Sequence, residues 1–136
     1  MGPFVEVSIH WFIRANIHIQ PSPGLFHFDP IIPHLYADVH PSLHDELIAA
    51  HVPYAMTSLG TPVCQPLWAN RELNGRRVYI ITTLDATFPE PVQRWFVEGS
   101  GVEWDVKEVK GGHAAFISQP EAVATVIAEA VGKWAY

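Results

Sequence analysis

The chain has 136 residues, of which 49% are hydrophobic and 16% charged, a composition typical of one globular domain with a modest core. The formal net charge of -6, from 14 acidic and 8 basic residues, provides no basic surface for a polyanion, so we expect no nucleic-acid partner. The single cysteine, Cys64, excludes an internal disulfide framework and a multi-thiolate zinc site.

The first thirty residues are interpreted as an unassigned leader. From Val5 to Ile19 every odd-numbered residue is apolar, and this period of two predicts one half-buried strand or two strands broken near residues 14–16. The following string QPSPGLFHFDPIIPH, residues 20–34, contains four prolines and a glycine and is typical of an irregular linker. No apolar run in the chain is long enough to span a bilayer, so we expect a cytoplasmic protein without membrane contact.

The middle of the chain predicts one short helix followed by a broken segment. In HPSLHDELIAAHV, residues 40–52, Pro41 lies near the first turn and Ser42 precedes Asp45 by three residues as a cap-like start. The next string, PYAMTSLGTPVCQPLW, is interrupted by prolines and glycine and predicts no long element.

The last sixty residues predict the order strand, helix, strand, helix. The apolar run from Val78 to Ile81 is typical of a strand covered on both faces, and this strand is expected to end at Asp85. The string FPEPVQRWFVEGSG predicts a helix that prolines open and glycine closes, and the alternating string VEWDVKEV predicts a second strand.

The final helix has the clearest helical pattern in the sequence. Ser118 and Glu121 form a capping-box pair around Pro120. Apolar residues then recur at helical spacing, namely Val123, Val126, Ile127, Ala130, Val131 and Trp134. We expect this stripe and Trp104 to form the best-packed part of the molecule.

Asp85 and His113 each follow one of the two predicted strands. A strand–helix–strand unit implies a right-handed crossover and a parallel pair, whose C-terminal ends lie on one edge of the sheet. Open α/β sheets place ligands and reactive groups at this edge. The sequence therefore predicts that the Asp85 carboxylate lies near an imidazole nitrogen of His113, and that Gly111 and Gly112 permit the turn that presents the histidine.

The strings VYIITTLDATFPEPVQRWFVE and VEWDVKEVKGGHAAFISQPEAVATVIAEAV closely resemble the C-terminal end of the α/β-hydrolase superfamily, especially small plant and fungal esterases and hydroxynitrile lyases. The resemblance extends back through residues 35–68, which are similar to the cap and linker of these proteins. It implies an α/β fold that is a partial α/β-hydrolase fold, with cap and linker helices and the last two β-α units of a parallel sheet. Residues 31–136 form this region, and residues 1–30 remain the leader with strands or irregular structure.

The resemblance further implies that Asp85 is the catalytic acid and His113 the catalytic base of a serine esterase or thioesterase. Such enzymes act on small ester or carbonyl compounds, and fungal members are often found in secondary-metabolite pathways. In a triad, the imidazole takes a proton from the nucleophile while the carboxylate holds the imidazole in the correct tautomer.

The nucleophile is missing from the sequence. The family places it in a Gly-x-Ser-x-Gly elbow before the acid, and no such string precedes Asp85. The strings EGSGVE and TSLGTPVCQP, the second of which contains Ser58 and Cys64, lack the elbow spacing. The first hypothesis is therefore a truncated or split hydrolase-family protein that is inactive alone.

Two other functions are open. One is a non-catalytic binding or interaction module, a pseudoenzyme that reuses this half of the fold and covers its exposed strand edge with a second copy or a partner chain. The other is a metal site at His40 and His44, with Asp45, Glu46 and His51 nearby, which is disfavoured because Pro41 lies at the helix start and no HExxH spacing exists. We expect no cofactor and no metal, and a small-molecule substrate or ligand if the chain is active.

Overall fold

The computed structural model describes residues 17–19, 24–61 and 64–135. The described strands are β1 (Ile17–Ile19), β2 (Leu25–Phe28), β3 (Tyr54–Ala55), β4 (Val78–Thr82) and β5 (Asp105–Val109). The described helices are α2 (Ile31–Leu35), α3 (His44–Ala50), α4 (Thr57–Gly60), α5 (Glu90–Gly99), α6 (Ala115–Ser118) and α7 (Pro120–Trp134), with short 3-10 turns at Pro41–Leu43, Leu67–Ala69 and Arg71–Leu73.

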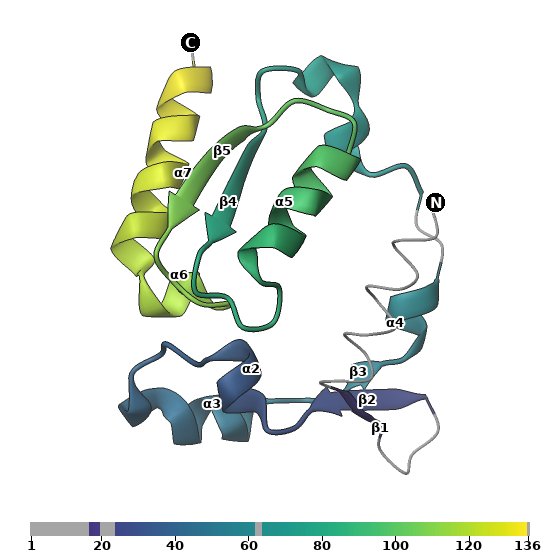
Figure 1. Ribbon diagram of the computed structural model, residues 1–136, viewed down its shortest axis with the longest axis vertical. Helices are drawn as coiled ribbons and strands as arrows, with labels where there is room; N and C mark the ends of the chain where they lie inside the picture. Colours follow the sequence, from purple (N-terminus) through teal and green to yellow (C-terminus); the bar gives the residue numbers. More distant parts are fainter. Residues whose placement is uncertain (1–16, 20–23, 62–63, 136) are drawn as a thin grey trace.

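The parallel pair formed by β4 and β5 confirms the predicted strand–helix–strand–helix order. Its register runs from Val78 opposite Asp105 to Thr82 opposite Val109, so the first strand ends at Thr82 and not at Asp85 as predicted, and Asp85 lies in the turn that follows. Helix α5 connects the two strands, and β4 and β5 lie between α5 and α7 (Figure 1). Both strands point toward the end of the sheet where α2, α3 and α6 lie. This is an α/β arrangement in which the C-terminal strand ends share one edge.

Helix α5 begins and ends where its prolines and glycine predict. Pro89 is the N-cap and Pro91 lies in the first turn, where a backbone N–H has no intrahelical partner. The helix ends at Gly99.

The prediction of an irregular linker over residues 20–34 is wrong for part of that range. Residues Leu25–Phe28 form β2, which pairs with β1 and β3 in an antiparallel sheet. Phe26 is buried there and stacks on Tyr54. Helix α2 also forms despite its proline, because Pro33 is the third helical residue and its missing N–H would have no helical acceptor. Of the predicted strand from Val5 to Ile19, residues 5–16 lie outside the described residues.

The two predicted helix caps differ from the observed ones. In the helix after residue 40, the side chain of His40, not that of Ser42, accepts a hydrogen bond at the N-terminus, from the Ser42 backbone N–H at 3.2 Å. The N-cap of α7 is Gln119, which makes no side-chain cap hydrogen bond. Ser118 ends α6 and donates its hydroxyl to Asp38 instead, so the predicted capping box does not form.

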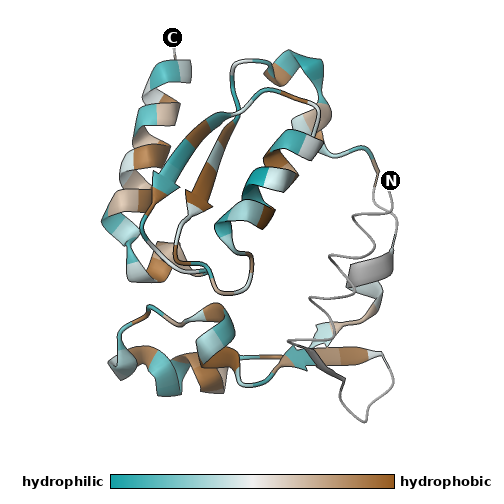
Figure 2. Cartoon of the chain, in the orientation of Figure 1, coloured by the Kyte–Doolittle hydropathy of each residue, from teal (hydrophilic) through white to brown (hydrophobic). Residues whose placement is uncertain are grey.

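Neither the apolar stripe of α7 nor Trp104, which is only half-buried, forms the best-packed part of the described chain. Helix α7 has no buried residue, and Ile127 and Val131 are 54% and 58% exposed. The buried apolar residues lie instead around β2, α2, β4, β5 and α6, and they are Phe26, Ile31, Leu35, Val39, Ile81, Val109, Ala114 and Ala115. Figure 2 shows apolar positions along β4 and also on α7. The predicted helical period was correct, but the pattern alone did not establish whether another part of the chain covers the stripe.

The buried guanidinium of Arg77 anchors the segment before β4. It donates to the backbone oxygens of Trp68 and Asn70, each at 2.6 Å, and to the Asn74 side chain at 2.9 Å. Each of the three guanidinium nitrogens therefore donates a hydrogen bond where the charge leaves water. In the described part of the chain, no helix is long and apolar enough to cross a membrane.

Ile81 and Ile127 provide a matched test of this packing. Ile81 is fully buried, so Ile81→Ala should lower the free energy of unfolding by about 2–5 kcal/mol. Ile127→Ala removes the same atoms from an exposed position and should cost about 1 kcal/mol or less. Urea unfolding of both variants measures the difference, and equal costs would contradict the observed burial.

Candidate functional site

The turns that follow β4 and β5 are joined beyond the ends of the strands. The backbone N–H of Thr83 donates to the Val109 oxygen and that of Leu84 donates to the Gly111 oxygen, both at 3.0 Å. These bonds extend the parallel pairing into the two turns. They bring the residues that follow, Asp85 on one side and His113 on the other, to the same edge.

Asp85 and His113 form the predicted contact. Nδ1 of His113 lies 3.0 Å from Oδ2 of Asp85, and the Asp85 side chain is 5% exposed while that of His113 is 32% exposed. A carboxylate accepts only, so Nδ1 carries the proton and Nε2 of a neutral ring is left as a base. Within the described residues, Nε2 has no hydrogen-bond partner, and the ring packs 5.7 Å from the Phe88 ring between centroids.

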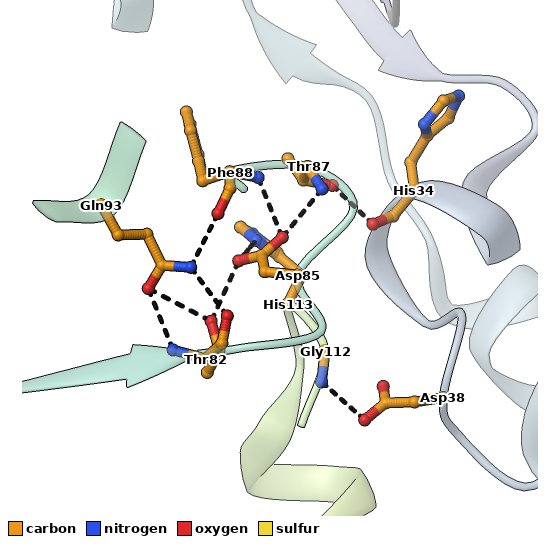
Figure 3. A network of polar contacts seen from close by, with 9 residues as sticks. All are labelled: His34, Asp38, Thr82, Asp85, Thr87, Phe88, Gln93, Gly112 and His113. Carbon is orange, nitrogen blue, oxygen red and sulfur yellow. Dashed lines mark hydrogen bonds and ion pairs between the residues drawn. The ribbon is translucent and has the colours of Figure 1, made fainter. Parts of the chain in front are cut away.

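Three other donors hold the Asp85 carboxylate (Figure 3). Its Oδ1 accepts the backbone N–H groups of Thr87 at 2.8 Å and Phe88 at 2.9 Å. Its Oδ2 also accepts the Thr82 hydroxyl at 3.2 Å. Both carboxylate oxygens therefore accept hydrogen bonds. These bonds hold the carboxylate so that its Oδ2 meets Nδ1 of His113.

These contacts determine the direction of the pKa shift of Asp85. Burial alone would raise the pKa, since it disfavours the charged form. The hydrogen bond from His113, the backbone bonds from Phe88 and Thr87 and the charge of the imidazole together outweigh burial, and the pKa lies below its ordinary value of 3.8. Asp85 is accordingly ionised at neutral pH and orients the imidazole.

Gln93, on α5, supports the acid turn in a way that the sequence analysis did not assign. Its side chain is buried. The amide oxygen accepts the Thr82 backbone N–H at 3.0 Å, and the amide nitrogen donates to the Thr82 oxygen at 2.9 Å and to the Phe88 oxygen at 2.7 Å. At the end of β4 the amide thus makes the backbone hydrogen bonds to Thr82 that a neighbouring strand would otherwise make. A glutamine in the first turn of the helix after an aspartate turn is the signal that could have suggested it.

The two glycines before His113 serve close packing and not the conformation that the sequence analysis gave them. The glycines with positive φ in the described residues are Gly24, Gly75 and Gly101. A Cβ on Gly111 would lie 3.0 Å from the Ala115 Cβ, and one on Gly112 would lie 2.4 Å from Oδ1 of Asp38. The turn is built from glycine because other groups occupy the side-chain space.

The candidate nucleophiles do not contact the histidine. Ser58 donates its hydroxyl to the Ala55 oxygen, and Ser100 lies at the far end of α5, where it donates to Val97. Cys64 is exposed. In the described part of the chain, no serine or cysteine side chain hydrogen-bonds His113.

The histidines of the metal hypothesis make other contacts. Nδ1 of His40 lies 2.8 Å from the Ser42 hydroxyl, and Nε2 of His44 lies 2.9 Å from the Val39 oxygen. Among the residues that the structure describes, no group of three or more histidine, cysteine, aspartate or glutamate side chains is placed to hold a metal ion.

Solved structures of α/β-hydrolases share the fold of this chain over about half of their own length. Polyneuridine aldehyde esterase is similar over 93% of this chain and 54% of its own, with a TM-score of 0.69 and 21% sequence identity. A pyrethroid hydrolase is similar over 90% of this chain and 49% of its own, with a TM-score of 0.68 and 20% identity. No protein-family model matches the sequence, and no curated protein matches it significantly. The chain therefore has a partial α/β-hydrolase fold and spans about half the length of these two structures.

The lowered pKa of Asp85 predicts a pH-dependent contribution to stability. Because the folded-state pKa lies below the ordinary value of 3.8, the contribution is complete above that value and is lost as the pH falls through the folded-state pKa. The free energy of unfolding of the wild type should exceed that of Asp85→Asn at about pH 6, and this difference should shrink toward about pH 2.

Urea unfolding at several pH values measures this difference. Asp45→Asn, which changes an exposed aspartate on α3, is the control and should differ little from the wild type. A difference between wild type and Asp85→Asn that is constant with pH would contradict the assigned contacts.

Proposed function

We propose that Asp85 and His113 are the acid–base half of an ester-hydrolase site that acts on small ester, thioester or carbonyl compounds. The observation that carries this proposal is the 3.0 Å contact between a buried carboxylate oxygen and Nδ1 of an imidazole that is partly exposed. In this role Nε2 takes the proton of a nucleophilic hydroxyl as its oxygen bonds to the substrate carbonyl carbon. The same proton then passes to the leaving group when the ester bond breaks.

The names of the similar structures support the substrate class. One is an esterase and the other a pyrethroid hydrolase. A role in secondary metabolism and a cytoplasmic location are parts of the same proposal, and they depend on the family resemblance of the sequence.

We propose that the nucleophile and the oxyanion donors come from polypeptide beyond the described residues, and that this polypeptide pairs with the open edge of β4. In a parallel strand the N–H and C=O of one residue point to the same side, and successive residues alternate. Arg77 and Thr83 bond to β5, whereas the N–H and C=O of Thr82 bond to Gln93 on the other side. Ile80 therefore directs its backbone groups away from β5, toward the open edge.

Apolar grooves adjoin β4 on both faces of the sheet. One groove, of about 570 Å³, is lined by the rings of Tyr79, Trp95 and Trp104 among others. A second groove, of about 420 Å³, is lined by Val78, Ile80 and the part of the α7 stripe from Val126 to Trp134. A strand added to β4, with helices of its own, would cover both grooves. Roughly half of each of the two similar structures has no counterpart in this chain, which is enough polypeptide to supply such a strand and its helices.

The isolated chain should have almost no hydrolase activity. It should not react with a fluorophosphonate probe, because no serine side chain among the described residues hydrogen-bonds His113 and could be activated by it. Turnover of p-nitrophenyl acetate should be weak, since general acid–base catalysis alone contributes only about 10²–10⁴-fold. Stoichiometric labelling of the chain alone, abolished by His113→Ala, would contradict the proposed missing nucleophile.

Co-expression with the nucleophile-bearing part of polyneuridine aldehyde esterase, the part that this chain does not match, tests the acid–base role. Probe labelling of that serine should appear and should be lost with His113→Ala and Asp85→Asn. The control variant His40→Ala changes an exposed imidazole and should leave labelling unchanged. Labelling that persists in His113→Ala would contradict the role of the pair.

Ile80→Pro tests the open edge in the same co-expressed pair. Proline at position 80 removes an outward N–H but no bond to β5, and it blocks the approach of a strand. The dissociation constant of the pair, measured by sedimentation, should rise by about tenfold or more. Ile80→Val keeps the N–H and should bind as the wild type does. Equal binding of the proline variant would contradict pairing at this edge and favour association through another surface.

A further inference from the structure

Asp38 makes contacts with the histidine turn that neither the sequence analysis nor the proposed mechanism uses. It follows α2, and its Oδ2 accepts the backbone N–H of Gly112 and the hydroxyl of Ser118, both at 2.6 Å. Gly112 directly precedes His113. The two donors therefore attach both ends of the short segment that carries the histidine to one carboxylate oxygen.

The contact is too close for any residue other than glycine at position 112. A Cβ there would lie 2.4 Å from Oδ1 of Asp38 and 2.8 Å from its Cγ. Oδ1 is itself buried and has no hydrogen-bond partner among the described residues. A carboxylate oxygen without a donor is costly in such a place, so packing against Gly112 and the bonds to Oδ2 must hold Asp38 in position.

The stretch of chain that contains Asp38 also holds the turn that carries Asp85. The buried hydroxyl of Thr87 donates to the backbone oxygen of His34 in α2, and the Thr87 N–H donates to Asp85. Figure 3 shows His34 and Asp38 approaching the Asp85–His113 pair from one side, each toward a different turn. One stretch of chain, residues 34–38, thus contacts both turns that carry the pair.

We propose that Asp38 is a positioning residue, which fixes the 112–118 segment so that the His113 ring meets Asp85 through Nδ1. The proposal rests on the proposed function of that pair. Asp38 makes no direct hydrogen bond to His113. It acts through the backbone N–H of Gly112, whose hydrogen bond it accepts. The loss of its acceptor oxygen should release the turn while leaving β4 and β5 paired.

The experiment follows the Nδ1 proton of His113 by ¹H–¹⁵N NMR of the purified chain labelled at histidine. A proton shared with a carboxylate is shielded from exchange and gives a downfield resonance. Asp38→Ala should lose this resonance at a urea concentration well below its unfolding midpoint. Asp38→Asn keeps one oxygen that can accept the bonds from Gly112 and Ser118, so this variant should retain the resonance. Asp45→Ala, which removes an exposed carboxylate from α3, should have no effect.

Two further variants keep the test decisive if Asp38→Ala does not fold. Gly112→Ala should lose the resonance because its Cβ displaces Asp38, and Ser118→Ala should weaken it because one of the two bonds remains. An unchanged resonance in folded Asp38→Ala or Gly112→Ala would overturn the proposal, as would its loss in Asp45→Ala or in folded Asp38→Asn.

The wild-type spectrum separates this inference from the proposed function. If the wild type lacks the resonance, the Asp85–His113 contact itself is absent and both proposals fail. If the wild type has it and Asp38→Ala keeps it, only the role of Asp38 fails.

Discussion

The register of β4 against β5 is the constraint on which the candidate site depends. Because Thr82 lies opposite Val109, the two turns begin at the same level, and the bond from Leu84 to Gly111 continues the pairing into them. A shift by one residue would move each side chain to the other face of the sheet and would separate Asp85 from His113. Most of the geometry at the site is therefore set by backbone pairing, and the side chains only complete it.

A buried carboxylate adds a second constraint, because removing it from water is expensive unless donors replace the lost hydration. Asp85 has four such donors, three of them from its own turn and strand and one from His113. The local donors fix the carboxylate whether or not the imidazole is present. The pair thus resembles a preorganised acid and base in which the histidine, attached through Gly112 to Asp38, is the more adjustable partner.

The sequence was sufficient to predict the elements that depend on local pattern. Its predictions failed where a residue far away in the chain determines the local contacts. Strand β4, helix α5 and the shared edge of Asp85 and His113 followed from periodicity, prolines and crossover rules. The glycine turn was located correctly but explained wrongly, because Asp38, the group that fills the space at Gly112, is 74 residues away in the chain. The capping box failed for the same reason, since Asp38 also takes the Ser118 hydroxyl.

The α7 stripe shows what an amphipathic pattern can and cannot establish. The pattern indicates that one face of the helix is suited to burial, yet Ile127 and Val131 are more than half exposed in the described structure. They line a groove together with Val78 and Ile80, on the strand where the backbone groups of Ile80 point away from β5. The contacts of Asp85 and His113, by contrast, are made entirely by described residues. Since that pair does not depend on what covers the groove, the proposed acid–base half of the site is already formed in this chain, while the surface that we propose receives the nucleophile-bearing polypeptide is still open.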